Sequence, residues 1–176
     1  SVQVGDLDGD ADNDLVVASA TRDLVVVWLN ATGDGMSWSR HAIPATVDEP
    51  GALALGDVNG DGRKDLLVAA AGEDTIAIWF QLDGSGTNYQ PVVLADDMVN
   101  PSAVQAVDLD DDLDLDVLAA SSGGLVAWWE NRDGSGTNWT RRILSTDRGG
   151  ASVVLAADMD GDGRLNILQA GGSSAA

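Results

Sequence analysis

The sequence has no cysteine and only one histidine, His41. Without cysteine it can form neither a disulfide framework nor a thiolate metal site. Transition metals prefer imidazole or thiolate ligands, and the chain offers almost none of either. No serine stands in a nucleophile-elbow context, so the sequence predicts no enzymatic role.

Basic residues are also scarce. Nine Lys and Arg stand against 29 Asp and Glu, which gives a net charge of -20. This charge repels the phosphates of nucleic acids and the surfaces of anionic membranes, and it leaves cations as natural small partners. We therefore expect no nucleic acid partner.

Long apolar runs and helical periodicity are missing as well. No apolar run approaches the roughly 20 residues of a membrane helix, so no membrane insertion is expected. No long stretch carries apolar residues at helical spacing without a glycine or acidic break. The hydrophobic content of 44% in 176 residues suffices for one domain or for a piece of a repeat array.

An acidic segment followed by an apolar one recurs four times along the chain. The clearest copy, GDVNGDGRKDLLVAA, begins at Gly56. The leading aspartates of the copies are Asp6, Asp57, Asp108 and Asp158, so the spacings are 51, 51 and 50 residues. Such a period is typical of repeat architectures, and a β-sandwich, the main alternative, has no reason to show it.

Each repeat contains short segments rich in Val, Ile, Leu and Trp, bounded by Gly, Asp and Asn. We predict an all-β fold of β-propeller blades, each with four antiparallel strands. The expected units are residues 1–50, 51–100 and 101–149 as three blades, 150–171 as the first half of a fourth and 172–176 as a flexible tail. The chain would then supply about three and a half blades.

The acidic segments have the composition of calcium loops. Ca²⁺ takes about 6–8 oxygen ligands, and alternating residues of a tight loop converge on one centre when residues between them accept positive φ. Positions 1, 3, 5 and 9 carry side-chain oxygens, and position 7 would offer its backbone carbonyl. In chain order, the candidate ligands are Asp6, Asp8, Asp10, Asp12 and Asp14; Asp57, Asn59, Asp61, Arg63 and Asp65; Asp108, Asp110, Asp112, Asp114 and Asp116; Asp158, Asp160, Asp162, Arg164 and Asn166.

The third loop is expected to bind most weakly, because Asp111 and Leu113 stand where the second and fourth loops have glycines. Magnesium fits these loops less well, because it needs stricter octahedral geometry. An EF-hand is excluded by the missing Glu at position 12 and by the flanking strands. The alternative to any metal site is a set of Asx turns, but so many like charges in tight turns would repel one another.

The four D-x-[DN]-x-D-G-x-x-[DN]-like loops at blade spacing resemble the FG-GAP or VCBS repeats, which build integrin-α-like β-propellers. The resemblance covers nearly the whole chain. It implies a calcium-stabilised, extracellular or cell-surface propeller used for adhesion or for surface or filament assembly. The alternatives are a carbohydrate-binding, lectin-like propeller and the accessory propeller of a larger secreted enzyme, since one fold serves many functions.

Tryptophans and sequons need separate interpretation. Trp28, Trp79 and Trp129 occupy one equivalent strand position, where a large side chain is expected to fill the space between blades. Exposed tryptophans could also stack on sugars. The sequons at Asn30 and Asn138 are possible glycosylation sites.

The fourth unit ends after two expected strands, which would leave an apolar face uncovered. Either another copy of the chain packs there or further blades belong to a longer chain. We therefore expect a homo-oligomer or a part of a longer protein rather than a stable isolated monomer, with a protein or glycan ligand that the sequence does not identify.

Overall fold

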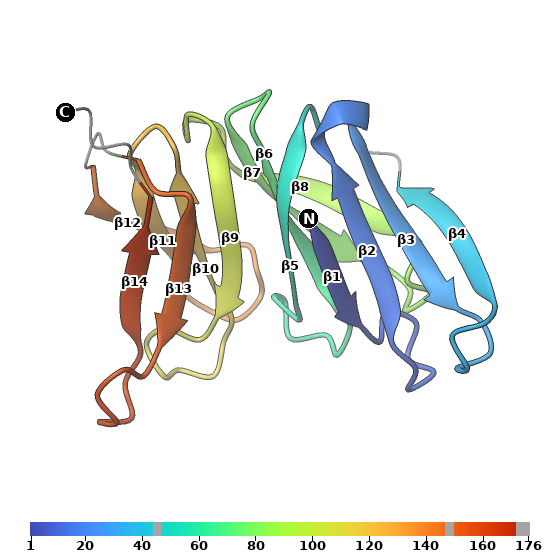
Figure 1. Ribbon diagram of the computed structural model, residues 1–176. Coiled ribbons are helices and arrows are strands. Elements are labelled where there is room, and N and C mark those ends of the chain that lie inside the picture. Colours follow the sequence, from blue (N-terminus) through green and yellow to red (C-terminus); the bar gives the residue numbers. More distant parts are fainter. Residues whose placement is uncertain (44–46, 147–149, 172–176) are drawn as a thin grey trace.

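The computed structural model describes residues 1–43, 47–146 and 150–171, and these form four successive sheets (Figure 1). The first sheet contains β1 (Val2–Gly5), β2 (Asp14–Ser19), β3 (Leu24–Asn30) and β4 (Trp38–Ile43), with the 3₁₀ turn η1 (Ala20–Arg22) between β2 and β3. The second contains β5 (Pro50–Gly56), β6 (Asp65–Ala70), β7 (Thr75–Gln81) and β8 (Tyr89–Ala95). The third contains β9 (Pro101–Val107), β10 (Asp116–Ser121), β11 (Val126–Asn131) and β12 (Trp139–Ser145). The fourth contains β13 (Val153–Ala157) and β14 (Asn166–Ala170).

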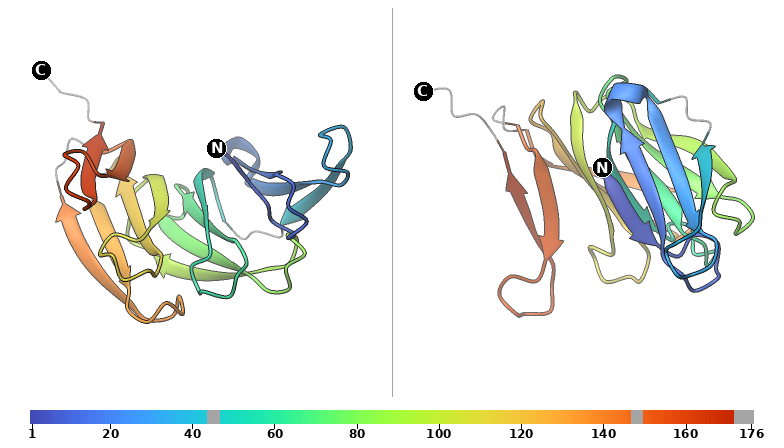
Figure 2. Two further views of the ribbon diagram at one scale, coloured as in Figure 1. Left: turned by 90° about the horizontal axis from the view of Figure 1, so that it is seen from below. Right: turned by 45° about the vertical axis from the view of Figure 1, so that its right-hand side comes forward.

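Within each sheet, neighbours in sequence are also neighbours in space, and every pair is antiparallel. This order is that of a propeller blade, so the expectation of an all-β chain with four-stranded antiparallel blades is confirmed. The sheets follow one another along an open arc, with the first and fourth sheets at its two ends (Figure 2). The described residues include no helix with the length and apolarity of a membrane span.

The assignment of residues to units stays a prediction. Pro50, which the sequence assigned to the first unit, is the first residue of β5 and so belongs to the second sheet. The expected flexible tail, residues 172–176, lies outside the described residues.

Strand burial follows each sheet's place in the arc. β6 and β10 are buried at every position, because a neighbouring sheet covers each of their faces. Their sequences, DLLVAA and DVLAAS, accordingly have no polar alternation. β2 alternates between buried and half-buried residues, because only one face of the first sheet is covered. The core is therefore a series of layers between blades.

Tryptophans fill two of these layers. Trp79 lies in the layer between the first and second sheets with Val27, and Trp129 lies in the layer between the second and third with Ile78. Both side chains are almost fully buried, which confirms the packing role expected for them. Trp28 has the same register position, opposite Leu15, but it is only half-buried, because no sheet formed by the described residues covers it. The packing role expected for Trp28 therefore stays a prediction.

Side-chain amides connect neighbouring blades. Gln81, the last residue of β7, donates from Nε2 to the carbonyl oxygen of Leu7 in the preceding blade at 3.0 Å. Asn131, the last residue of β11, donates from Nδ2 to the carbonyl oxygen of Val58 at 2.9 Å. Because both bonds are buried, they exclude competing water and set the position of one blade on the next.

Truncation of the two equivalent tryptophans should separate the packing contribution from strand propensity. We expect Trp79→Ala to lower the free energy of unfolding by about 3–5 kcal/mol, because it leaves a cavity between two blades. Trp28→Ala removes the same side chain at the same register position on an uncovered face, and should cost less than half as much. Urea unfolding followed by circular dichroism measures both values, and equal losses would contradict the layered core.

Candidate metal centre

The four acidic loops connect the first two strands of each sheet and lie along the same side of the arc, the lower side in Figure 1. We number their positions 1 to 9, over residues 6–14, 57–65, 108–116 and 158–166. In all four loops the residues at positions 4 and 6 have positive φ. They are Gly9 and Ala11, Gly60 and Gly62, Asp111 and Leu113, and Gly161 and Gly163. The loops thus share one backbone conformation, although only five of these eight residues are glycine.

Position 1 organises the interior of each loop. In the fourth loop, the Asp158 carboxylate accepts hydrogen bonds from the backbone N–H groups of Gly161 and Gly163, at 2.7 and 3.0 Å. These N–H groups lower the pKa of Asp158. The corresponding aspartates of the other loops, Asp6, Asp57 and Asp108, each accept two N–H bonds within their own loop. The carboxylate at position 1 therefore holds each loop in its turn.

Three loops bring carboxylate oxygens close together. In each, three oxygens lie within 4.8 Å of one another, from Asp6, Asp8 and Asp14; from Asp108, Asp110 and Asp112; and from Asp158, Asp160 and Asp162. Burial, followed by the charges of neighbouring aspartates, raises the pKa values of Asp8 and Asp110. A hard cation would relieve this repulsion, and the donors are all oxygen, so the residues present fit calcium.

The second loop is arranged differently. Asn59 stands at position 3, and the carboxylate of Asp61 forms an ion pair with the guanidinium of Arg63 and accepts a bond from Asn59 Nδ2. Within the described part of the chain this loop does not form a three-carboxylate group. Arg63 also donates from Nε to the carbonyl oxygen of Gln81. A cation in this loop would have to displace the guanidinium from Asp61, although the sequence offers side-chain oxygens at positions 1, 3, 5 and 9.

Position 9 has a role that the sequence did not indicate. Asp65 is fully buried, and its two oxygens accept the N–H groups of Val58, at position 2, and Gln81, at the end of β7. Asp14 and Asp116 are buried in the same way, with N–H bonds from the second loop residue and from the last residue of the third strand. These carboxylates tie each loop to its own blade, whether or not they also bind metal.

The fourth loop has Asn166 at position 9, where Oδ1 accepts the Met159 N–H at 3.0 Å. The described residues of this sheet include two strands, so one acceptor at this position serves one donor. Asparagine and aspartate therefore differ here in the number of N–H groups that they satisfy.

Position 7 was expected to offer its backbone carbonyl to a metal. The structure shows the contacts of its side chains and of one N–H group. A Cβ atom added to Gly33 would lie 2.1 Å from Oδ2 of Asp12, and one added to Gly134 would lie 2.4 Å from Oδ1 of Asp114. Both carboxylates therefore pack against the turn between the third and fourth strands of their own blade. Arg164 donates its N–H to Asp162 at 2.8 Å. Metal binding by the carbonyls at position 7 stays a prediction.

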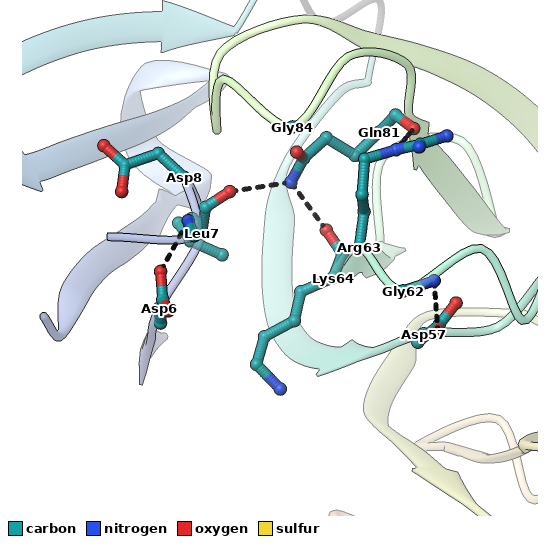
Figure 3. A pocket seen from close by; sticks show the side chains of 10 residues that line it. Asp6, Leu7, Asp8, Asp57, Gly62, Arg63, Lys64, Gln81 and Gly84 are labelled. Carbon is teal, nitrogen blue, oxygen red and sulfur yellow. Dashed lines mark hydrogen bonds between the residues drawn. The ribbon is translucent and has the colours of Figure 1, made fainter. Parts of the chain in front are cut away.

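A cleft of about 270 Å³ separates the first and second acidic loops (Figure 3). Asp6 and Asp8 line one side, and Asp57, Arg63 and Lys64 line the other. The Nε2 atom of Gln81 lies between the loops and bonds the carbonyl oxygens of both Leu7 and Lys64 (Figure 3). Neighbouring candidate metal loops are therefore mechanically connected through one amide.

The two sequons differ in their surroundings. The side chain of Asn30 is buried, and its Oδ1 accepts the Gly35 N–H at 3.1 Å. Asn138 is exposed beside β12. Glycosylation stays a prediction, and the burial of Asn30 disfavours it there.

A family model described as FG-GAP-like repeat matches the chain three times, over residues 6–68, 57–119 and 108–168. Each match begins at position 1 of an acidic loop and extends past the next loop, so consecutive matches overlap. No curated protein matches the chain.

Replacing the strained residue of the third loop should raise the stability and the calcium affinity of that loop. Leu113 has a φ of 77° and is 90% exposed, so its side chain gains little from packing. Left-handed backbone costs about 1–2 kcal/mol for a residue with a Cβ. Leu113→Gly should therefore stabilise the chain by about 1 kcal/mol and tighten calcium binding at this loop. Gly62→Leu is the matched reverse change, because nothing lies within 4 Å of a Cβ there, and should destabilise by a similar amount.

Calorimetric titration with calcium and thermal unfolding of both variants check this pair. Unchanged stability and calcium affinity in Leu113→Gly would show that the backbone strain has no influence on the loop.

The buried Asp65 should make metal-free stability depend on pH. Burial raises its pKa from 3.8 to about 6, against the lowering effect of its two N–H bonds. Between these values the folded chain keeps a proton on Asp65 that the unfolded chain has lost. The stabilisation of the folded chain by this proton is fully present below pH 3.8 and is lost as the pH rises through 6. Between pH 7 and pH 5, wild type should gain about 1 kcal/mol relative to Asp65→Asn in chelator. Parallel stability curves for the two proteins would contradict this.

Proposed function

The chain belongs to the FG-GAP-like repeat family, and we propose that it is a calcium-stabilised, non-catalytic propeller module that acts in adhesion or assembly outside the cell or at its surface. The observation that carries this proposal is the shared conformation of the four acidic loops. Each places position 4 and position 6 at positive φ, and three of them gather three carboxylates. No cation within the described residues other than Arg63 is paired with a loop carboxylate.

Calcium has a clear structural task in this proposal. The net charge of -20 opposes compaction, and much of it is concentrated in loops along one side of the arc. Divalent cations bound there would offset the repulsion and hold the loops in their turns. Because β1–β2, β5–β6, β9–β10 and β13–β14 are joined by these loops, ordered loops also hold the blades in register.

A non-catalytic role is supported by the surroundings of the single histidine. His41 lies on β4, and its Nε2 is 2.8 Å from the Ser39 hydroxyl oxygen. A serine–histidine pair needs a third group that orients the imidazole. Among the hydrogen bonds of the described residues, none joins a carboxylate to His41. The pair therefore lacks the support that nucleophilic catalysis requires.

Sugar binding is the second candidate, and the tryptophans support it only weakly. The guanidinium of Arg40 lies over Trp28, that of Arg142 over Trp128 and that of Arg141 over Trp129, at 5.9, 5.1 and 5.2 Å from the ring centroids. These ring faces are already occupied by cations. Trp38 and Trp139 use their indole N–H groups to bond Gly35 and Gly136 in their own turns. A glycan array probed in calcium tests this candidate.

Removal of calcium should destabilise the folded chain. A site saturated at 100 times its dissociation constant contributes about 2.7 kcal/mol, which corresponds to a shift in Tm of at least about 5 °C in a chain of this size. We expect Tm to fall by that amount or more when a chelator replaces calcium. Magnesium at equal ionic strength is the control for charge screening and should restore only a small part of the shift.

Single substitutions assign the sites. Asp158→Asn and Asp57→Asn should each reduce the calcium-dependent shift, whereas Asp83→Asn, in a turn between β7 and β8, should leave it unchanged. Identical melting curves in calcium and chelator would refute the calcium proposal.

A further inference from the structure

The second acidic loop already contains a cation of its own, the guanidinium of Arg63. One terminal nitrogen of this group forms an ion pair with Oδ2 of Asp61, at position 5. Its Nε donates to the carbonyl oxygen of Gln81, the last residue of β7, at 3.0 Å. Because the two contacts use different nitrogens of one planar group, they fix the guanidinium between the loop and its blade.

The oxygen that Arg63 occupies is one that the other loops leave without a bond. At position 5, Oδ1 accepts the N–H of position 7 in every loop, at 2.8 to 3.0 Å. These carboxylates belong to Asp10, Asp61, Asp112 and Asp162. No described residue bonds Oδ2 of the first, third or fourth of them. In the second loop, Oδ2 accepts both the guanidinium and Asn59 Nδ2, the latter at 2.9 Å, so this oxygen is already in use.

The fourth loop shows that an arginine at position 7 does not by itself block the carboxylates. Arg164 stands at this position, and glycines occupy positions 4 and 6, as in the second loop. Among residues 1–43, 47–146 and 150–171, no carboxylate forms an ion pair with Arg164. The carboxylate oxygens of the fourth loop lie close together. The pairing in the second loop therefore depends on the surroundings of Arg63 as well as on its residue type.

We propose that Arg63 is a built-in competitor of calcium, which sets the calcium concentration at which the second loop fills. In the calcium-free chain the guanidinium occupies Oδ2 of Asp61, and calcium enters only when the guanidinium leaves. A site that is competent only part of the time has an apparent affinity reduced by that fraction. The second loop should therefore fill at a higher calcium concentration than the fourth. This inference rests on the proposed calcium role of the acidic loops.

The displaced guanidinium would not be left buried without a partner. The side chain of Arg63 is 34% exposed, so water can hydrate the guanidinium once it leaves Asp61. Arg63 also lines the cleft of about 270 Å³ between the first two loops, and Asp6 and Asp8 line the opposite side (Figure 3). Since release creates no buried unpaired charge, the contact with Asp61 can break and form again as the calcium concentration changes.

A calcium titration followed by ¹⁵N–¹H NMR tests the proposal at single loops. The reporters are the amides of Gly62 and Gly163, which bond Asp57 and Asp158 at position 1 of their loops. In wild type, Gly62 should respond at a calcium concentration at least about threefold higher than Gly163. Arg63→Met keeps the apolar stem and removes the guanidinium. It should lower the Gly62 midpoint by about tenfold and leave that of Gly163 unchanged.

Two further variants separate the ion pair from the general effect of charge. Lys64→Met removes the neighbouring positive charge, which forms no ion pair with any carboxylate that the structure describes. It should lower the Gly62 midpoint by less than about threefold. Arg63→Lys keeps the charge but loses the planar group that joins Asp61 to Gln81, and should give an intermediate midpoint. In chelator, Arg63→Met should also lower Tm by about 1–3 °C, because the loop loses its internal cation.

Two results would overturn the proposal and leave the calcium role intact. One is an unchanged Gly62 midpoint in Arg63→Met while Gly163 still responds, which would show that the guanidinium does not compete. The other is an equal fall in Arg63→Met and Lys64→Met, which would show that only the net charge of the loop matters. A failure of the calcium role itself looks different, because neither glycine would then respond in any variant, and the inference would fail with it.

Discussion

The arrangement of the blades depends on the buried carboxylate at position 9 of the first three acidic loops. Asp65 accepts N–H bonds from Val58 and Gln81, and Gln81 in turn bonds the carbonyl of Leu7. Leu7 donates its own N–H to Asp14. On the other side, Asn131 bonds both Asp116 and Val58. These contacts form one continuous series of hydrogen bonds through three blades, so each loop is held by its own sheet and by the next.

This series explains why charged residues can be tolerated between apolar layers. A buried carboxylate without partners is costly, and burial, followed by the charges of neighbouring aspartates, raises the pKa values of Asp65 and Asp116. Two N–H groups for each carboxylate offset part of that cost. The remaining acidic residues of the loops are at the surface, where a cation can reach them, so one short segment combines a structural anchor with a set of candidate ligands.

The repeat also shows how context changes the role of an identical position. Trp28 and Trp79 share register and strand type, but within the described residues only Trp79 is packed between two sheets. Leu113 and Gly62 share a left-handed backbone, but only Leu113 has a Cβ that makes this conformation costly. Equivalent positions therefore share their backbone conformation more closely than their contribution to stability. The ends of the arc and the third loop are the places where the two differ.

The sequence by itself determined the blades and the location of the loops, because a 51-residue period, short apolar segments and turn residues are local features. It also indicated that Trp79 and Trp129 would pack between blades. Only the tertiary structure decided that Asp14, Asp65 and Asp116 face inward. It also decided that Arg63 forms an ion pair with Asp61, and that Gln81 and Asn131 join neighbouring blades. Those contacts link residues more than 70 positions apart in the case of the two amides. Their geometry exists only after one sheet has packed on the next, so no spacing within a single repeat could have specified them.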